Sequence, residues 1–322
     1  MRYLVLSLLP VVAFCEPASV APSSKVNYPS NFQVESGCNL FVLGDGLYWT
    51  AQEAGLYYAQ ETGGGLKQLD PNYSGGLRVG IGLTFPKEGF DTLFSWVYFS
   101  SQAEKHSHGS LLPLWAEPDF SPLATASKAS GKWDLDLNVA DLEWGRSSWF
   151  GGHFSCRPFF SLRGAWIEQH FHAHYTYVTT PVTTGHLRAN SSFQGGGLRA
   201  GADSRFALPY GFSVYGTASG SLLYGTIDGD ASTLENSTVI AKTKDHFNTG
   251  ISAVQLALGW GWDTHFAKER LHLELHMGWE ANLWFSINQM NHFVNGLSQG
   301  LFFKEKGNLS TQGLTAGGRF SF

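Results

Sequence analysis

The feature that most constrains this chain is an alternation of apolar and polar residues that continues over unusually long segments. Between residues 271 and 286 every odd position is apolar, and most even positions are polar or glycine. A period of two indicates a β-strand with two different faces. Strands of soluble proteins average about five or six residues, whereas a tilted membrane crossing takes about nine to eleven. Similar segments at 77–85 and 254–262 therefore favour an all-β, antiparallel transmembrane β-barrel.

The composition excludes the main alternatives. Charged residues make up 15% of the chain and aromatic residues another 15%, against about 25% charged residues in soluble proteins. Beyond the N-terminus there is no run of about 20 apolar residues, which each helical crossing would require. The net charge of -5 offers no basic surface for nucleic acid, so no nucleic-acid partner is expected.

The N-terminus predicts export. Met1 and Arg2 precede the apolar run 3–14, and this order is typical of a secretory signal peptide. We expect a signal peptide over 1–15, a flexible periplasmic segment over 16–37 and an outer-membrane barrel over 38–322. Lipid attachment at Cys15 is disfavoured because the bulky Phe14 precedes it.

The alternation predicts ten strands, separated by turns and loops of unequal length. Short connections alternate with long ones, as in outer-membrane barrels, whose turns are periplasmic and whose loops are extracellular. Twelve strands are an alternative, but that count breaks the alternation of short and long connections. The alternation continues up to a terminal Phe322. The outer-membrane assembly machinery recognises this C-terminal pattern in such barrels. The predicted strands are 39–60, 74–85, 90–101, 132–145, 155–178, 191–206, 211–225, 248–266, 270–288 and 310–322, and the predicted long loops are 61–73, 102–131, 179–190, 226–247 and 289–309.

If the apolar face meets lipid, the charged face must line the interior, because a charge near the membrane midplane costs about 2–4 kcal/mol. The segment 90–101 is apolar on both faces and leaves its orientation open, and Asp141 and Glu143 face inward only if a bulge lies near Asn138. The predicted pore-lining residues are Arg78, Asp141, Glu143, Arg157, Arg163, Arg199, Asp203, Arg205, Asp263, His272, Glu274, His276, Glu280 and Arg319. Trp49, Trp166, Trp260 and Trp284 are expected at the membrane borders.

Mixed charge inside a barrel has two interpretations. Arginines that face carboxylates across a narrow passage create a transverse field that selects small polar solutes. The same groups can also pair into a network that plugs the barrel. Barrels of about eight strands are filled by side chains and those of sixteen or more hold open channels, so ten strands lie near the closed end.

Other constellations are weaker. His170, His172 and His174 lie on one face of a strand about 6.5–7 Å apart, and we favour a solvated strand extension over a metal site, which also needs closing geometry. His272 and His276, with their acidic neighbours, could form a proton-titratable constriction, although ordinary interior polarity is favoured. Ten-stranded outer-membrane proteases need acidic and His groups at the mouth. No such spacing appears here, so neither catalytic residues nor cofactors are expected.

Cys38 and Cys156 are both expected at periplasmic strand ends, in an oxidising compartment. The first and fifth strands of a ten-stranded barrel lie nearly opposite each other, farther apart than the roughly 7 Å Cα separation that a disulfide allows. We therefore expect both thiols to be free or to cross-link neighbouring molecules.

Several segments resemble one known family. Asp45–Ala59 (DGLYWTAQEAGLYYA), Gly75–Gly80 (GGLRVG), Asp141–Arg146 (DLEWGR) and Arg157–Ile167 (RPFFSLRGAWI) are similar to the Legionella-type major outer-membrane proteins, which are also found in Chlamydia-related bacteria. The resemblance implies a pore-forming outer-membrane protein without catalytic residues. For this protein, the expected partners are outer-membrane lipid, the outer-membrane assembly machinery, small polar solutes and further copies of the chain. A surface-binding role through the long loops is the alternative, and an envelope hydrolase is a distant third.

Overall fold

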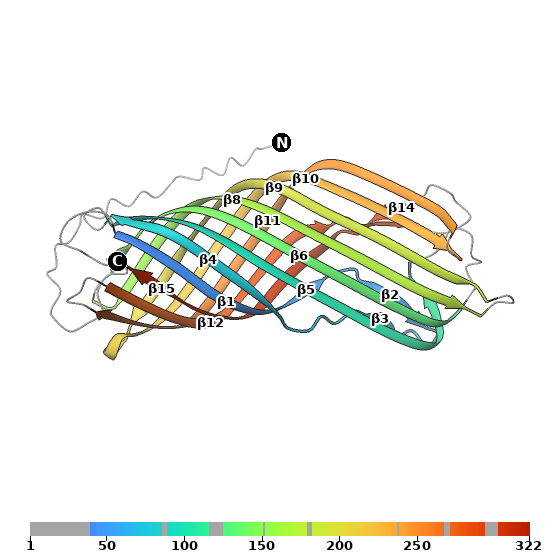
Figure 1. Cartoon of the computed structure of the whole chain (residues 1–322), viewed down its shortest axis with the longest axis horizontal. Helices are drawn as coiled ribbons and strands as arrows, with labels where there is room; N and C mark the ends of the chain where they lie inside the picture. Colours follow the sequence, from blue (N-terminus) through green and yellow to red (C-terminus); the bar gives the residue numbers. More distant parts are fainter. Residues whose placement is uncertain are drawn as a thin grey trace, which may run out of the picture.

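The computed structural model describes residues 39–322 except 86–88, 116–124, 151, 179–181, 237, 267–270 and 294–301. The predicted signal peptide, the predicted periplasmic segment and Cys38 lie outside the described residues. The chain forms a long closed barrel (Figure 1). Its ten strands are β1 (Asn39–Glu53), β4 (Ser74–Phe85), β5 (Phe90–Pro113), β6 (Ala126–Arg146), β8 (Phe154–Tyr177), β9 (Thr184–Ala207), β10 (Phe212–Glu235), β11 (Thr238–Phe266), β12 (Leu271–Asn288) and β15 (Gly307–Ser321).

All neighbouring strands are antiparallel, and the ladder closes on itself. β1 pairs with both β4 and β15, so the first and last strands lie side by side. β5 pairs with β6 and completes the circle. The expectation of ten antiparallel barrel strands is confirmed, and the twelve-strand alternative is wrong.

Short elements decorate the barrel. They are β2 (Tyr57–Glu61), β3 (Leu66–Gln68), β7 (Ser148–Phe150), β13 (Asn291–Phe293), β14 (Phe302–Lys304) and the 3-10 turn η1 (Pro209–Gly211). β2 and β3 form a hairpin that adds to the edge of β5. No helix among the described residues is long and apolar enough to cross a membrane.

The strands are much longer at one end of the barrel than the sequence predicts. β5 and β6 pair from Phe90 to Leu111 and from Ala126 to Arg146, so the expected loop 102–131 is mostly strand. β10 and β11 likewise pair up to Glu235 and Thr238, so the expected loop 226–247 is wrong as well. The short connections and the C-terminus lie at the opposite end, on the left in Figure 1, which is the periplasmic end of outer-membrane barrels.

The outer surface divides the barrel into two zones. In the zone nearer the periplasm, which we call the membrane zone, the outward side chains are large and apolar, such as Leu162, Leu198 and Leu258. Tyr48, Tyr73 and Trp279 lie together near its outer border, with Tyr48 and Tyr73 stacked at 5.2 Å. Aromatic side chains gather at such borders because their amphipathic rings suit the lipid headgroups.

Beyond this border, in what we call the extracellular zone, the pattern is inverted without any break in the strands. On β8 the outward positions change from Phe160 and Leu162 to His170 and His172, while the inward positions change from Ser161 and Arg163 to apolar residues. The interior of the extracellular zone is a dry core of large side chains. Its members include Trp49, Trp115, Trp133, Leu135, Ile167, Phe171, Tyr175, Leu187, Phe193, Ile227, Trp284 and Met290.

This inversion explains why the expected bulge near Asn138 and the expected border positions of Trp49 and Trp284 are wrong. The register of β6 with β8 is continuous from Lys128 to Gly145, so no bulge lies at Asn138. Trp133, Leu135, Leu137 and Val139 point inward with Asp141, because they belong to the dry core. Trp49 and Trp284 are buried in the same core and do not mark the membrane border, whereas Trp166 and Trp260 are exposed on the outer surface.

The two-sided apolar segment 90–101 is also oriented by the structure. Phe90, Phe94 and Trp96 are exposed on the outer surface, while Asp91 and Val97 are buried inside. The apolar inward residues of this strand continue into the dry core. The sequence could not orient the segment because the strand crosses from one zone into the other.

Candidate functional site: the charged interior of the membrane zone

The interior of the membrane zone holds a cavity of about 290 Å³. Of the fourteen predicted pore-lining residues, twelve line this cavity. The other two, Asp263 near the end of β11 and His272 near the start of β12, lie nearer the periplasmic end. The twelve are Arg78, Asp141, Glu143, Arg157, Arg163, Arg199, Asp203, Arg205, Glu274, His276, Glu280 and Arg319.

One ionic cluster is centred on Arg78 of β4. Its guanidinium donates to both oxygens of Glu280, at 2.7 and 2.9 Å, and to Asp45 Oδ2 at 3.1 Å. Nε2 of His276 lies 3.0 Å from the other oxygen of Asp45. One terminal nitrogen of Arg78 contacts both oxygens of Glu280 and the other contacts Asp45, so Arg78 joins β1, β4 and β12.

A second cluster is centred on Arg157 of β8. Its guanidinium donates to Asp91 of β5, to Glu143 of β6 at 2.6 Å and to Asp203 of β9 at 2.8 Å. Arg199 reaches the second oxygen of Glu143 at 2.9 Å. Three carboxylates therefore share one guanidinium, and Glu143 is held between two arginines.

A single neutral side chain connects the two clusters. Gln255 of β11 accepts a hydrogen bond from Arg199 at 2.7 Å and donates one to Glu280 at 2.7 Å. An amide can do this because it carries both an acceptor and a donor. The result is a continuous polar network with members on eight of the ten barrel strands, from β4 and β1 through β12, β11, β9 and β8 to β6 and β5.

The remaining cations are also engaged. Arg163 forms a bidentate pair with Asp141, with both contacts at 2.8 Å. Arg205 pairs with Glu274. Arg319 donates to Thr84 at 3.2 Å and lies over the ring of Phe41.

The sequence interpretation missed three members of this network, namely Asp45, Asp91 and Gln255. Asp45 lies in the segment that carries the family resemblance, and Asp91 lies in the strand that could not be oriented. Gln255 carries no charge, so the rule that places charges inside does not select it. The sequence signal that could have placed Asp45 and Asp91 inside is their negative charge, because a carboxylate that faces lipid is energetically costly.

Inward-folded segments close the extracellular end above this site. Trp115, just beyond β5, donates to the carbonyl of Tyr57 at 2.9 Å and packs on Phe171 and His292, with ring centroids 4.7 and 4.4 Å away. Tyr175 donates to the carbonyl of Tyr58 at 2.6 Å. Together with the dry core, these contacts form a plug, which we define as the dry core plus the inward segments around Tyr58, Trp115 and Met290.

The plug contains one carboxylate without a counter-charge. Neither oxygen of Glu53 has a hydrogen-bond partner among the described residues. It lies five residues beyond Tyr48, outside the membrane zone. Burial raises the pKa of Glu53 to about 8, against a smaller opposing effect of the nearby Gln169 amide.

Two further expectations concern residues outside the cavity. His170, His172 and His174 face outward on the extracellular extension of β8, as predicted from their parity. His174 packs against His186 of β9, with ring centroids 4.2 Å apart. Cys156 is a free cysteine in the described part of the chain, and its relation to Cys38 stays a prediction.

Ten antiparallel strands closed around a charged interior, with an apolar belt outside, define an integral outer-membrane β-barrel protein. The model of one family, described as the Legionella pneumophila major outer membrane protein precursor, matches residues 40–322. The chain therefore belongs to this family and resides in the outer membrane.

Sequence and structure comparisons add distant similarities. No curated protein matches the chain in sequence. The outer membrane protease OmpT of Escherichia coli is similar with a TM-score of 0.42 at 10% identity, over 88% of this chain and 96% of that one. The toluene transporter TodX of Pseudomonas putida gives a TM-score of 0.28 at 9% identity, over 91% of this chain and 90% of that one.

Proposed function

We propose that this protein is a porin-like channel for passive diffusion of small polar solutes and ions, and that it is not an enzyme. The observation that carries the proposal is the charged interior of the membrane zone. The extracellular zone fills the same bore with apolar side chains, so this barrel does not need charge merely to be filled. Buried ion pairs are weak sources of stability compared with apolar packing, which favours a functional reason for them.

The mixed charge supports passage of small polar solutes. Arg157 and Arg199 contact carboxylates of nearby strands in the cavity wall, and a wall of charged side chains favours small polar solutes and ions over apolar ones. Opening requires the plug to move, because the dry core closes the extracellular end in the described conformation. The inward segments around Tyr58 and Trp115 are the parts of the plug that are not barrel wall.

A conductance measurement tests the proposal. Protein reconstituted in planar bilayers is expected to show discrete steps, and Trp115→Ala is expected to increase their frequency, because it removes contacts to two inward segments. Tyr210→Ala, in an exposed periplasmic turn, is the matched control and should behave as wild type. Absence of steps from both wild type and Trp115→Ala would overturn the channel proposal.

The plug favours a second candidate, a closed barrel that acts as a structural or surface-binding protein. In that case no variant conducts, and the polar outward face of the extracellular zone carries the activity. A hydrolase is disfavoured because apolar side chains occupy the interior at the extracellular mouth and the β8 histidines face away from it. Incubation with a peptide mixture is expected to give no cleavage products.

The partners we propose follow from the surface. The apolar belt contacts outer-membrane lipid and offers a surface for a homo-oligomer. Phe322, half-exposed at the end of the barrel and paired with the backbone of Leu40, would be the contact for the assembly machinery. Exchanging Phe322 for Ser is expected to lower the amount of folded barrel in outer membranes, measured by heat-modifiable gel mobility.

A further inference from the structure

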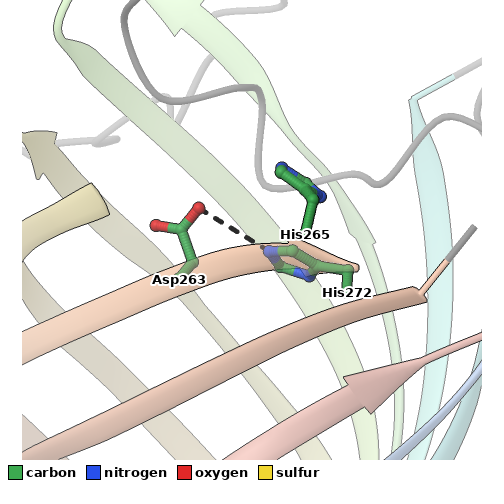
Figure 2. Close-up of side chains that lie close together, drawn as sticks. All are labelled: Asp263, His265 and His272. Carbon is green, nitrogen blue, oxygen red and sulfur yellow. Dashed lines mark ion pairs between the residues drawn. The ribbon is translucent and has the colours of Figure 1, made fainter. Parts of the chain in front are cut away.

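Three side chains at the periplasmic end of the interior wall come together in a metal-ligand arrangement that the proposed channel function does not use. They are Asp263 and His265 of β11 and His272 of β12 (Figure 2). One ligand atom from each lies within 4.8 Å of the other two. Nε2 of His272 is 3.6 Å from Oδ2 of Asp263, and the two imidazole centroids are 4.7 Å apart.

The strand geometry explains why these residues meet. Asp263 and His265 are two residues apart, so they lie on the same face of β11. His265 pairs directly with His272 in the register of β11 with β12, which brings the two side chains close together. β12 is paired on its other side with β15, where His272 lies opposite Ser321, and all three ligands are carried by strands and not by a loop.

From this geometry we propose that Asp263, His265 and His272 bind a divalent transition metal ion, with zinc as the best match. Two imidazoles and one carboxylate are a borderline donor set that suits zinc, whereas calcium and magnesium prefer oxygen ligands alone. Zinc sites with three protein ligands take a fourth ligand from water or solute. In the occupied site the nitrogen and oxygen ligand atoms would lie about 2.0–2.2 Å from the ion.

The charges around the cluster are compatible with a dication. Arg205 is the cation that interacts electrostatically with Asp263, and it is paired with Glu274. Glu274 lies opposite Asp263 in the register, so the pair brings no net charge to the site. The carboxylate of Asp263 then compensates one charge of the ion.

The outward histidines of the extracellular zone are a weaker candidate. His174 and His186 supply two imidazoles, but partial burial and, to a smaller extent, repulsion by Arg188 lower the pKa of both His172 and His186. Among the described residues no third ligand joins this pair within the range that the Asp263 cluster meets. His174 and His186 should therefore be substituted before zinc binding to the Asp263 cluster is measured, so that they do not contribute to the signal.

Zinc titration of the folded full chain in detergent micelles, after chelator treatment, tests the proposal. We use the variant His174→Gln/His186→Gln as the parent, so that the outer pair does not contribute. Isothermal calorimetry is expected to give one zinc ion per chain, and cobalt is expected to give the visible absorption of a site with imidazole ligands. No binding to this parent would overturn the proposal.

Single changes then assign the ligands. In the same parent, His265→Gln and Asp263→Asn are each expected to weaken zinc binding at least tenfold. His153→Gln, an exposed periplasmic histidine, should leave binding unchanged. Unaltered affinity in the first two variants, or equal loss in the His153 control, would overturn the assignment. Heat-modifiable gel mobility identifies folded protein, and Asp263→Asn keeps the side-chain shape if His265→Gln does not fold.

Discussion

The two zones of the barrel are built from the same strands, but the apolar face of the strands is on opposite sides of the wall in the two zones. In the membrane zone, apolar side chains face outward and charged ones face inward. In the extracellular zone, the outward face carries residues such as His172 and Asp230, and the interior is a dry aromatic core. Neither the pairing nor the alternation changes at the border, so the solvent outside the wall, not the strand, decides which face is apolar.

The zones also differ in whether their buried carboxylates contact a cation. In the membrane zone Asp141, Glu143 and Glu280 each contact at least one arginine. In the extracellular zone Glu53 is buried without a cation. A paired carboxylate stays charged, whereas an isolated one is forced toward its neutral form. The first zone is therefore a network of fixed charges, whereas in the second zone burial raises the pKa of Glu53 to about 8.

The largest expected effect breaks the dry core. Phe171 is fully buried and packs on Trp115, so Phe171→Ala should cost about 3–5 kcal/mol of unfolding free energy through lost contacts and a cavity. Ser161→Ala, on the same face ten residues nearer the periplasm, is the matched change and should cost only about 0.5–1.5 kcal/mol for its hydrogen bond to Asp141. Denaturant unfolding in lipid vesicles measures both, and equal costs would contradict the dry core.

The second expected effect tests the outer surface. Leu258 of β11 is 65% exposed among apolar neighbours, and Leu258→Arg should cost about 2–4 kcal/mol if it lies near the membrane midplane. Asn248→Arg, ten residues along the same face, should be nearly neutral because water surrounds it. The same unfolding assay applies. A neutral Leu258 variant would mean that the lipid belt lies elsewhere.

The third effect depends on pH. The unfolded chain releases the proton of Glu53 near its ordinary pKa of 4.5, but the folded protein keeps it up to about pH 8. The contribution of this group to stability is therefore greatest in acid and is lost as the pH rises from about 4.5 to 8. Glu53→Gln should remove this decline, because the amide carries no charge, and should stabilise the protein above pH 8 by more than about 1.4 kcal/mol, the equivalent of one pKa unit.

Unfolding midpoints of wild type and Glu53→Gln between pH 5 and about pH 9 measure this effect. Parallel pH profiles for the two proteins would show that Glu53 does not titrate in this range. In a conducting protein, the same ionisation should loosen the plug, and channel openings should become more frequent with increasing pH on the extracellular side.

The smallest effect concerns an exposed ion pair. Lys105 lies 2.7 Å from Asp70 on the surface of the extracellular zone, and hydrogen bonding to Asp70 raises the pKa of Lys105. Because water screens both groups, Lys105→Met should change the unfolding free energy by at most about 1 kcal/mol. A larger loss would place this pair in a structural role similar to that of the arginines inside.

Much of the barrel could be predicted from the sequence. The ten strands, their antiparallel order and most of the inward charges follow from alternation and from the cost of a charge in lipid. Arg78, Arg157 and Glu280 were selected by parity alone, and the cavity contains them. The pairing of these groups could not be predicted, because it depends on which strands face each other across the bore.

The wrong expectations share one cause, which is that the lipid rule was applied over the whole length of each strand. On β6 the inward parity is apolar at Leu135 and Leu137 and acidic at Asp141 and Glu143. This change of character at constant parity was interpreted as a bulge, but it marks the membrane border. A switch of this kind within an unbroken alternation is the sequence signal that would have located both zones and the plug.

The inversion also sets an order for assembly. Before the barrel closes, each long strand carries apolar residues on both faces, at different heights, and no single environment can shelter both sets. Lipid can cover the belt as soon as the wall inserts, but the dry core needs strands from all sides of the ring. The dry core includes side chains of both β1 and β15, such as Trp49 and Leu309, so its packing is complete only once these two strands have paired.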